Sequence, residues 1–89
     1  MKAVSFKRKV VKPMFKAFID GKALKFSGDE ATAKAAEGQH ALTWVVLGDS
    51  GDSYTIEIAA PAESKFKHTA TLDSDRKDAG LHWFTVAAE

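Results

Sequence analysis

The longest apolar alternation in the chain spans residues 39–58, with the sequence QHALTWVVLGDSGDSYTIEI. One face of an extended strand here would carry His40, Leu42, Trp44 and Val46, and the other would carry Ala41, Thr43, Val45 and Leu47. Both faces are largely apolar, so this strand is expected to be covered on both sides. Residues 48–52 supply a glycine-rich turn, and the return strand alternates until Pro61, which cannot donate to a ladder. The stretch therefore predicts a central β-hairpin.

The first third of the chain predicts a strand followed by a second hairpin. Residues 3–11 alternate, with Val4, Phe6, Arg8 and Val10 on one face, and Pro13 ends the pattern. In residues 14–26, the Asp20-Gly21 pair favours a two-residue type I′ turn. That turn sets a register in which Ile19 opposes Lys22, Ala17 opposes Leu24 and Phe15 opposes Phe26.

Residues 27–37, SGDEATAKAAE, fit two structures. Ser27 and Glu30 have the spacing of a helix capping box, and the alanines favour a short helical turn near residues 29–36. A helix this short is only marginally stable and has no apolar stripe larger than alanine. The alternation of alanines with polar residues fits an edge strand, which we favour because the neighbouring elements are strands.

The last third adds alternating segments at residues 64–72 and 81–87, joined by a polar, exposed loop at residues 73–80. The chain then holds seven or eight short strands and no helix long enough to connect parallel strands. We therefore predict an all-β fold, an antiparallel β-sandwich or a small barrel, with residues 1–89 forming a single domain.

The amino-acid composition excludes several kinds of functional site. The chain contains no cysteine, which excludes disulfides, thiolate catalysis and zinc or iron–sulfur sites with cysteine ligands. No apolar run approaches the ~20 residues that a membrane-spanning helix needs. The basic start MKAVSFKRKVV lacks the apolar segment of a signal peptide, so export is expected only if a leader has been trimmed. No cellular compartment is predicted.

Charge is unevenly distributed along the chain. Residues 1–25 hold eight of the thirteen Lys and Arg residues and a single acid, Asp20. A basic surface built from this region could attract a polyanion such as a nucleic acid. The residues that would form it are Lys7, Arg8, Lys9, Lys12 and Lys16. The alternative is that acidic segments fold back onto these bases as solvated neighbours.

Two short segments resemble catalytic or metal-binding motifs, but neither meets the full requirements of its motif. The letters Gly48-Asp49-Ser50-Gly51 occur around the nucleophile of trypsin-like proteases, but a fold of that kind needs far more than 89 residues. Residues 73–78 begin like a calcium loop, yet Lys77 occupies a ligand position and Phe84 stands where a bidentate glutamate is required. An irregular Ca²⁺ site would use Asp73, Asp75 and Asp78, joined by Asp49 and Asp52 if the two loops share an end of the fold.

The three histidines, His40, His68 and His82, lack the short spacings that are typical of zinc ligands. We therefore predict no metal site, no cofactor and no catalytic residue.

Aromatic side chains are the remaining candidates for a binding site, because they could form a platform for sugar rings or bases. Trp44 lies among apolar alternates and is expected in the core. We predict that any exposed aromatic platform uses Trp83 or Tyr54.

The order of several landmarks resembles the small immunoglobulin-like modules of the PEGA type over residues 15–61. These landmarks are Asp20-Gly21, Gly38-Gln39-His40, Leu42, Trp44, a turn, then Tyr54, Ile56, Ile58 and Pro61. The Pro-Glu-Gly-Ala letters that define those modules are missing. The resemblance implies an immunoglobulin-like sandwich that acts as a recognition or adaptor module at a bacterial cell surface and not as an enzyme.

Three functions are consistent with these patterns. The first is a non-catalytic binding or adaptor domain for a protein or glycan. The second is a small β-barrel that binds nucleic acid through the basic residues of the first third, which near-neutral overall charge disfavours. The third is a carbohydrate-binding module that uses an exposed tryptophan.

Overall fold

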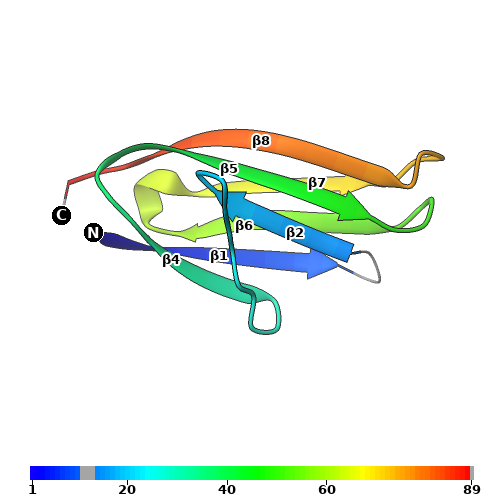
Figure 1. Cartoon of the computed structure of the whole chain (residues 1–89), viewed down its shortest axis with the longest axis horizontal. Helices are drawn as coiled ribbons and strands as arrows, with labels where there is room; N and C mark the ends of the chain where they lie inside the picture. Colours follow the sequence, from blue (N-terminus) through cyan, green and yellow to red (C-terminus); the bar gives the residue numbers. More distant parts are fainter. Residues whose placement is uncertain (11–13, 89) are drawn as a thin grey trace.

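The computed structural model of the protein describes residues 1–10 and 14–88. These residues form the strands β1 (Lys2–Val10), β2 (Met14–Ile19), β3 (Lys22–Ala23), β4 (Glu30–Ala35), β5 (Gly38–Leu47), β6 (Ser53–Ala60), β7 (Phe66–Thr71) and β8 (Lys77–Val86), and one 3-10 helix, η1 (Ala62–Ser64). Sheet 1 has the order β4-β1-β6-β7 and sheet 2 the order β3-β2-β5-β8. The two antiparallel sheets form two layers (Figure 1), which confirms the predicted all-β sandwich.

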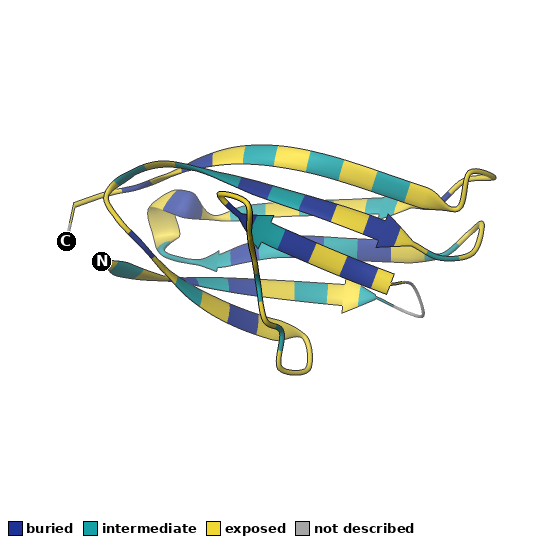
Figure 2. Cartoon of the chain, in the orientation of Figure 1, coloured by how far each residue is buried: buried dark blue, intermediate teal, exposed yellow. Residues whose placement is uncertain are grey.

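A hydrophobic core lies between the two sheets. Along most strands buried and exposed residues alternate (Figure 2), because successive side chains of a strand point to opposite faces. The most deeply buried large side chains are Tyr54, Phe6, Leu42, Ile56, Ile58, Val4, Val46 and Val86. Each contributes about 1.5–3 kcal/mol through burial, which is the main stabilising term in a chain without disulfides.

The predicted central hairpin is wrong, because β5 and β6 belong to different sheets. Both edges of β5 are occupied within sheet 2, by β2 on one side and β8 on the other, while β6 pairs with β1 and β7. Residues 48–52 therefore cross from one layer to the other. The crossing loop is held by backbone hydrogen bonds from Gly51 N to Leu72 O and from Leu72 N to Asp52 O.

The outer face of β5 also differs from the prediction that both faces are covered. Leu42, Trp44 and Val46 are buried against sheet 1, as their alternation predicts. On the other face Val45 and Leu47 are about two-fifths exposed. A two-layer sandwich has only one interior, so a strand that is apolar on both faces must leave one of them to solvent or to a partner.

The second predicted hairpin is confirmed, but its ladder is short. Asp20 and Gly21 both have positive φ, 50° and 82°, as a type I′ turn requires. Ile19 pairs with Lys22 as expected, and the ladder ends after Ala23 with one further bond, from Leu24 N to Ala17 O. Beyond that bond the chain leaves β2 and crosses to sheet 1, which opens a gap beside the first half of β2.

The ambiguous segment at residues 27–37 is a strand, so the helical alternative is wrong. Residues 30–35 form β4 at the edge of sheet 1, with Ala31 and Ala35 buried against the core. Near the other end of the chain β8 begins at Lys77, so the predicted loop over residues 73–80 is shorter than expected. Within the described parts of the chain, no helix has the length and apolar character needed to span a membrane.

Candidate functional site

The outer surface of sheet 2 is apolar although it faces solvent. We call it the apolar face; it comprises Met14, Lys16, Phe18, Ala41, Thr43, Val45, Leu47, Lys77, Ala79, Leu81 and Trp83. Leu81 and Trp83 on β8 are the most exposed of the large hydrophobic side chains on this face, at 55% and 56% exposure. The outer surface of sheet 1 is polar by contrast, with hydroxyl pairs such as Ser53–Thr71 and Thr55–Thr69.

Strand register makes the apolar face continuous. Successive rows across the sheet hold Met14, Leu47 and Lys77, then Lys16, Val45 and Ala79, then Phe18, Thr43 and Leu81, then Ala41 and Trp83. Side chains directly opposite each other on paired strands lie about 5 Å apart at Cβ, so these rows touch. The exposed large side chains present on the order of 500 Å² of apolar surface, near the upper end for a monomeric protein.

The three aromatic candidates have different positions. Trp83 is exposed on the apolar face, whereas Trp44 and Tyr54 are 3% and 1% exposed. Trp44 Nε1 donates to the Tyr54 hydroxyl at 3.0 Å, and that hydroxyl donates to Asp78 Oδ2 at 2.5 Å. Burial, with a further contribution from the Asp78 hydrogen bond, raises the pKa of Tyr54 to about 12. Tyr54 is thus part of a buried polar chain and has no ring face open to a ligand.

A cleft of about 350 Å³ opens between the edge strands β7 and β8. The rings of Phe66 and His82 stack across it with centroids 3.7 Å apart, and burial lowers the pKa of His82. Gly80 on β8 lies directly against Trp44: a Cβ at this position would come within 2.2 Å of Trp44 Cζ2. Trp44 can therefore fill this edge of the core only because residue 80 has no side chain.

The predicted polyanion-binding residues do not form one surface. Lys7 and Lys9 point outward from sheet 1, and Lys7 Nζ lies 3.9 Å from Glu30 Oε1. Lys16 lies on the outer face of the other sheet. Arg8 points inward, as its place in the apolar alternation of β1 indicates. Lys12 lies outside the described residues.

Arg8 and Lys16 both line a cleft at the gap that the diverging hairpin opens. We call this the Arg8 cleft; it has a volume of about 300 Å³ and is lined by Arg8, Phe15, Lys16, Ala17, Phe18, Ala23, Leu24 and Phe26. The guanidinium carbon of Arg8 lies 4.4 Å from the centroid of the Phe26 ring and 5.9 Å from that of Phe15. The sequence reasoning grouped Arg8 with the surface lysines and missed this cleft.

The acidic loop residues do not form a metal site. Loops 48–52 and 72–76 do share one end of the sandwich, but Arg76 occupies the space between them and binds Asp49 Oδ1 at 2.7 Å. Asp78 is directed to Tyr54 instead. Within residues 1–10 and 14–88, no three His, Asp or Glu side chains converge in a way that could hold a metal ion.

His40 forms a polar link between two turns. Its Nδ1 donates to Asp20 Oδ2 at 2.5 Å and its Nε2 donates to Ala36 O at 2.7 Å. Both partners act as acceptors, so the two bonds form together only when both ring nitrogens carry a proton, and this arrangement favours the imidazolium form. The hydrogen bond to Asp20, with that to Ala36, raises the pKa of His40, and bonds from Ala41 N–H and His40 lower the pKa of Asp20.

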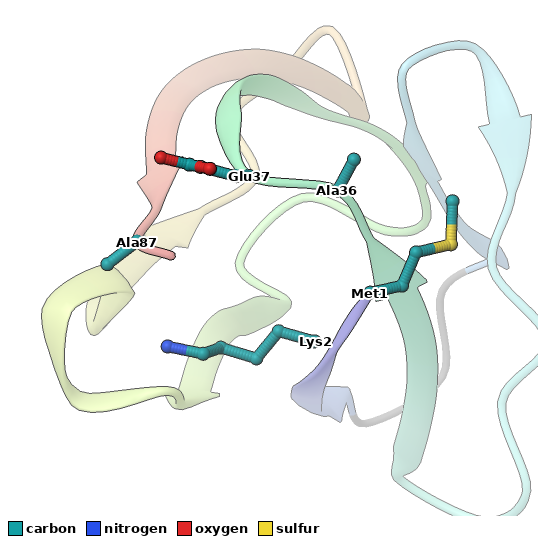
Figure 3. A pocket seen from close by; sticks show the side chains of 5 residues that line it. All are labelled: Met1, Lys2, Ala36, Glu37 and Ala87. Carbon is teal, nitrogen blue, oxygen red and sulfur yellow. The ribbon is translucent and has the colours of Figure 1, made fainter. Parts of the chain in front are cut away.

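A shallow hollow of about 270 Å³ lies at the end of the sandwich where the two termini emerge. Figure 3 shows its lining of Met1, Lys2, Ala36, Glu37 and Ala87. The lining is short or flexible, and the ammonium of Lys2 is bound to Glu63 at 2.8 Å. This ion pair links β1 to η1. The hollow is smaller than either of the two clefts.

The fold and these surfaces define a two-layer all-β protein with one apolar outer face. Comparisons of the chain with protein-family models, with curated proteins and with solved structures found no match.

Proposed function

We propose that this protein is a non-catalytic binding domain that docks a protein partner on its apolar face. The observation that carries the proposal is the continuous exposure of large apolar side chains across β2, β5 and β8. Three strands of this length span roughly 14 Å by 30 Å, so a partner that covers them buries about 1,000 Å² in total. That area is sufficient for a specific, reversible complex.

The charges on the apolar face indicate the chemistry of the partner. Lys16 and Lys77 are its charged residues, and they lie at opposite margins, on β2 and β8. No acid among the described residues of this face balances them. A complementary partner therefore combines an apolar centre with acidic residues at its margin.

Two groups suited to acid–base chemistry, His40 and Tyr54, are engaged in structural roles, which supports a non-catalytic function. Both nitrogens of His40 are hydrogen-bonded, and the Tyr54 hydroxyl is buried with a pKa of about 12. A turnover found in a broad hydrolase panel, and abolished by substitution of a residue of this chain, would overturn this part of the proposal.

The docking proposal is tested with a random peptide library displayed on phage and panned on the wild-type protein. We expect enriched peptides that mix apolar residues with Asp or Glu. The Leu81→Ser/Trp83→Ser variant should weaken their binding at least ~10-fold, because exposed aromatic and aliphatic anchors dominate such contacts. The Thr69→Ala/Thr71→Ala variant, on the outer face of sheet 1, is the matched control and should bind normally. Equal binding to the Leu81/Trp83 variant would refute the proposal.

A glycan on Trp83 is a second candidate, favoured by the exposure of this indole on a flat sheet. Its neighbours Ala41 and Leu81 offer no side-chain hydrogen bonds to sugar hydroxyls, whereas the exposed pair Gln39 and Thr85, one row away on the other side, does. A glycan panel read by tryptophan fluorescence tests it, since the buried Trp44 does not contact such a ligand. A quench that disappears in Trp83→Phe would support this function; an unchanged spectrum across the panel would end it.

A further inference from the structure

We infer that the Arg8 cleft is a binding site for a small amphipathic carboxylate, an anion with an apolar body of about eight to ten carbons. This site shares Lys16 and Phe18 with the margin of the apolar face, but it does not depend on the proposed docking function. The cleft is lined by the basic residues Arg8 and Lys16 and by apolar walls from Phe15, Leu24 and Phe26. A volume of about 300 Å³ lies at the lower end for small-molecule sites.

The guanidinium of Arg8 has donors to offer. Arginine carries five N–H groups, and within the described residues Arg8 uses one of them, from Nη2 to Gly28 O at 3.1 Å. Its Nε is the one buried side-chain nitrogen or oxygen without a hydrogen-bond partner among the described residues. Asp29 lies 3.9 Å from Nε, beyond hydrogen-bond distance, and is largely exposed, so water screens this pair.

The guanidinium is also held in a fixed position. Its central carbon lies over the Phe26 ring, 4.4 Å from the centroid, and Phe15 meets Phe26 edge to face with ring centroids 5.9 Å apart. The side chain therefore loses little further freedom when it binds a ligand. A carboxylate can accept a bidentate pair of bonds from guanidinium, and Lys16 supplies a second positive charge at the rim of the cleft.

The walls of the cleft select an apolar body for the ligand. They exist because the β2–β3 ladder stops after Ala23 and the chain from Leu24 to Phe26 turns away from β2. Phe15 stays with the core, and Leu24 and Phe26 pack against that core while remaining partly open. An alkyl chain or a single ring in the gap would displace water from these side chains.

The test titrates octanoate into ¹⁵N-labelled protein, with octylammonium as a probe of equal length and opposite charge. We expect saturable amide shifts confined to Arg8 and to residues 15–18 and 23–26, with octanoate at least ~10-fold tighter than octylammonium. The Lys16→Gln variant should bind octanoate several-fold more weakly than the wild type. Lys9→Gln is the matched control, since it makes the same charge change on an exposed side chain that points away from the cleft, and it should bind as the wild type does.

Three results would overturn the inference. Equal affinity for the two probes would show hydrophobic adsorption without recognition of the anion. Equal weakening by Lys9→Gln and Lys16→Gln would show a long-range charge effect and no local site. Shifts centred on Val45, Leu81 and Trp83 would place octanoate on the apolar face. The Leu81→Ser/Trp83→Ser variant should keep octanoate binding, so failure of the docking proposal and failure of this one are distinguishable.

Discussion

Removal of the Tyr54 hydroxyl should destabilise the fold far more than removal of a hydroxyl at the next residue. Tyr54→Phe keeps the buried ring and deletes one oxygen, which links Trp44 Nε1 at 3.0 Å to Asp78 Oδ2 at 2.5 Å. The Trp44 side chain is almost fully buried, so its N–H is then left without a partner and water cannot reach it.

The expected magnitude follows from the burial of the two partners. An unsatisfied buried donor costs about 1–3 kcal/mol, which applies to the Trp44 indole. Asp78 is half-buried, so water replaces part of its lost bond and the further cost is about 1 kcal/mol. The free energy of unfolding should therefore fall by about 2–4 kcal/mol, which for a domain of this size lowers Tm by roughly 10–25 °C.

Urea unfolding followed by the fluorescence of Trp44, in a Trp83→Phe background, measures the change. Thr55→Val is the matched control: it also deletes one hydroxyl from β6, but its bond to Thr69 lies on the outer face of sheet 1. We expect the control to lie within about 0.5 kcal/mol of the parent protein. A Tyr54→Phe loss equally small would refute the assignment of a buried hydrogen-bond chain to this side chain.

Three further predictions concern pH and packing. The pKa of His40 is raised above its ordinary 6.5 by Asp20, so its stabilising effect is complete below pH 6.5 and is lost as pH rises through the folded value; Asp20→Asn should bring the NMR-titrated pKa of His40 down. Tyr54 is the only tyrosine, and its absorbance at alkaline pH should titrate near 12, with stability falling between pH 10 and 12 because the unfolded chain ionises first. Gly80→Ala should cost at least ~2 kcal/mol in urea unfolding, because the new methyl group would displace Trp44, and a neutral result would refute that contact.

Local patterns in the sequence located the strands and their buried faces. Alternation placed Leu42, Trp44 and Val46 inside, and the Asp20-Gly21 pair fixed the β2–β3 register. Both properties depend on a few neighbouring residues, so a sequence pattern carries them.

These local patterns could not predict which distant strands pair with each other. A glycine-rich turn such as residues 48–52 can reverse a chain within one sheet or carry it to the other, and which of these occurs depends on the strands that already occupy the edges of β5. The same limit explains why β5 was expected to be covered on both faces. The Arg8 cleft depends on where the β2–β3 ladder ends, which is again set by the crossing of the chain to sheet 1.

Hydroxyl and charged side chains cover one broad surface of this sandwich, and mostly apolar side chains cover the other. At an interface between water and a less polar phase, the protein would adopt one orientation. The hydroxyl-bearing surface would face the water, and the surface that carries Trp83 would face the less polar phase. Copies gathered at a boundary of this kind would share one orientation. Their 43 Å long axes would lie along the boundary.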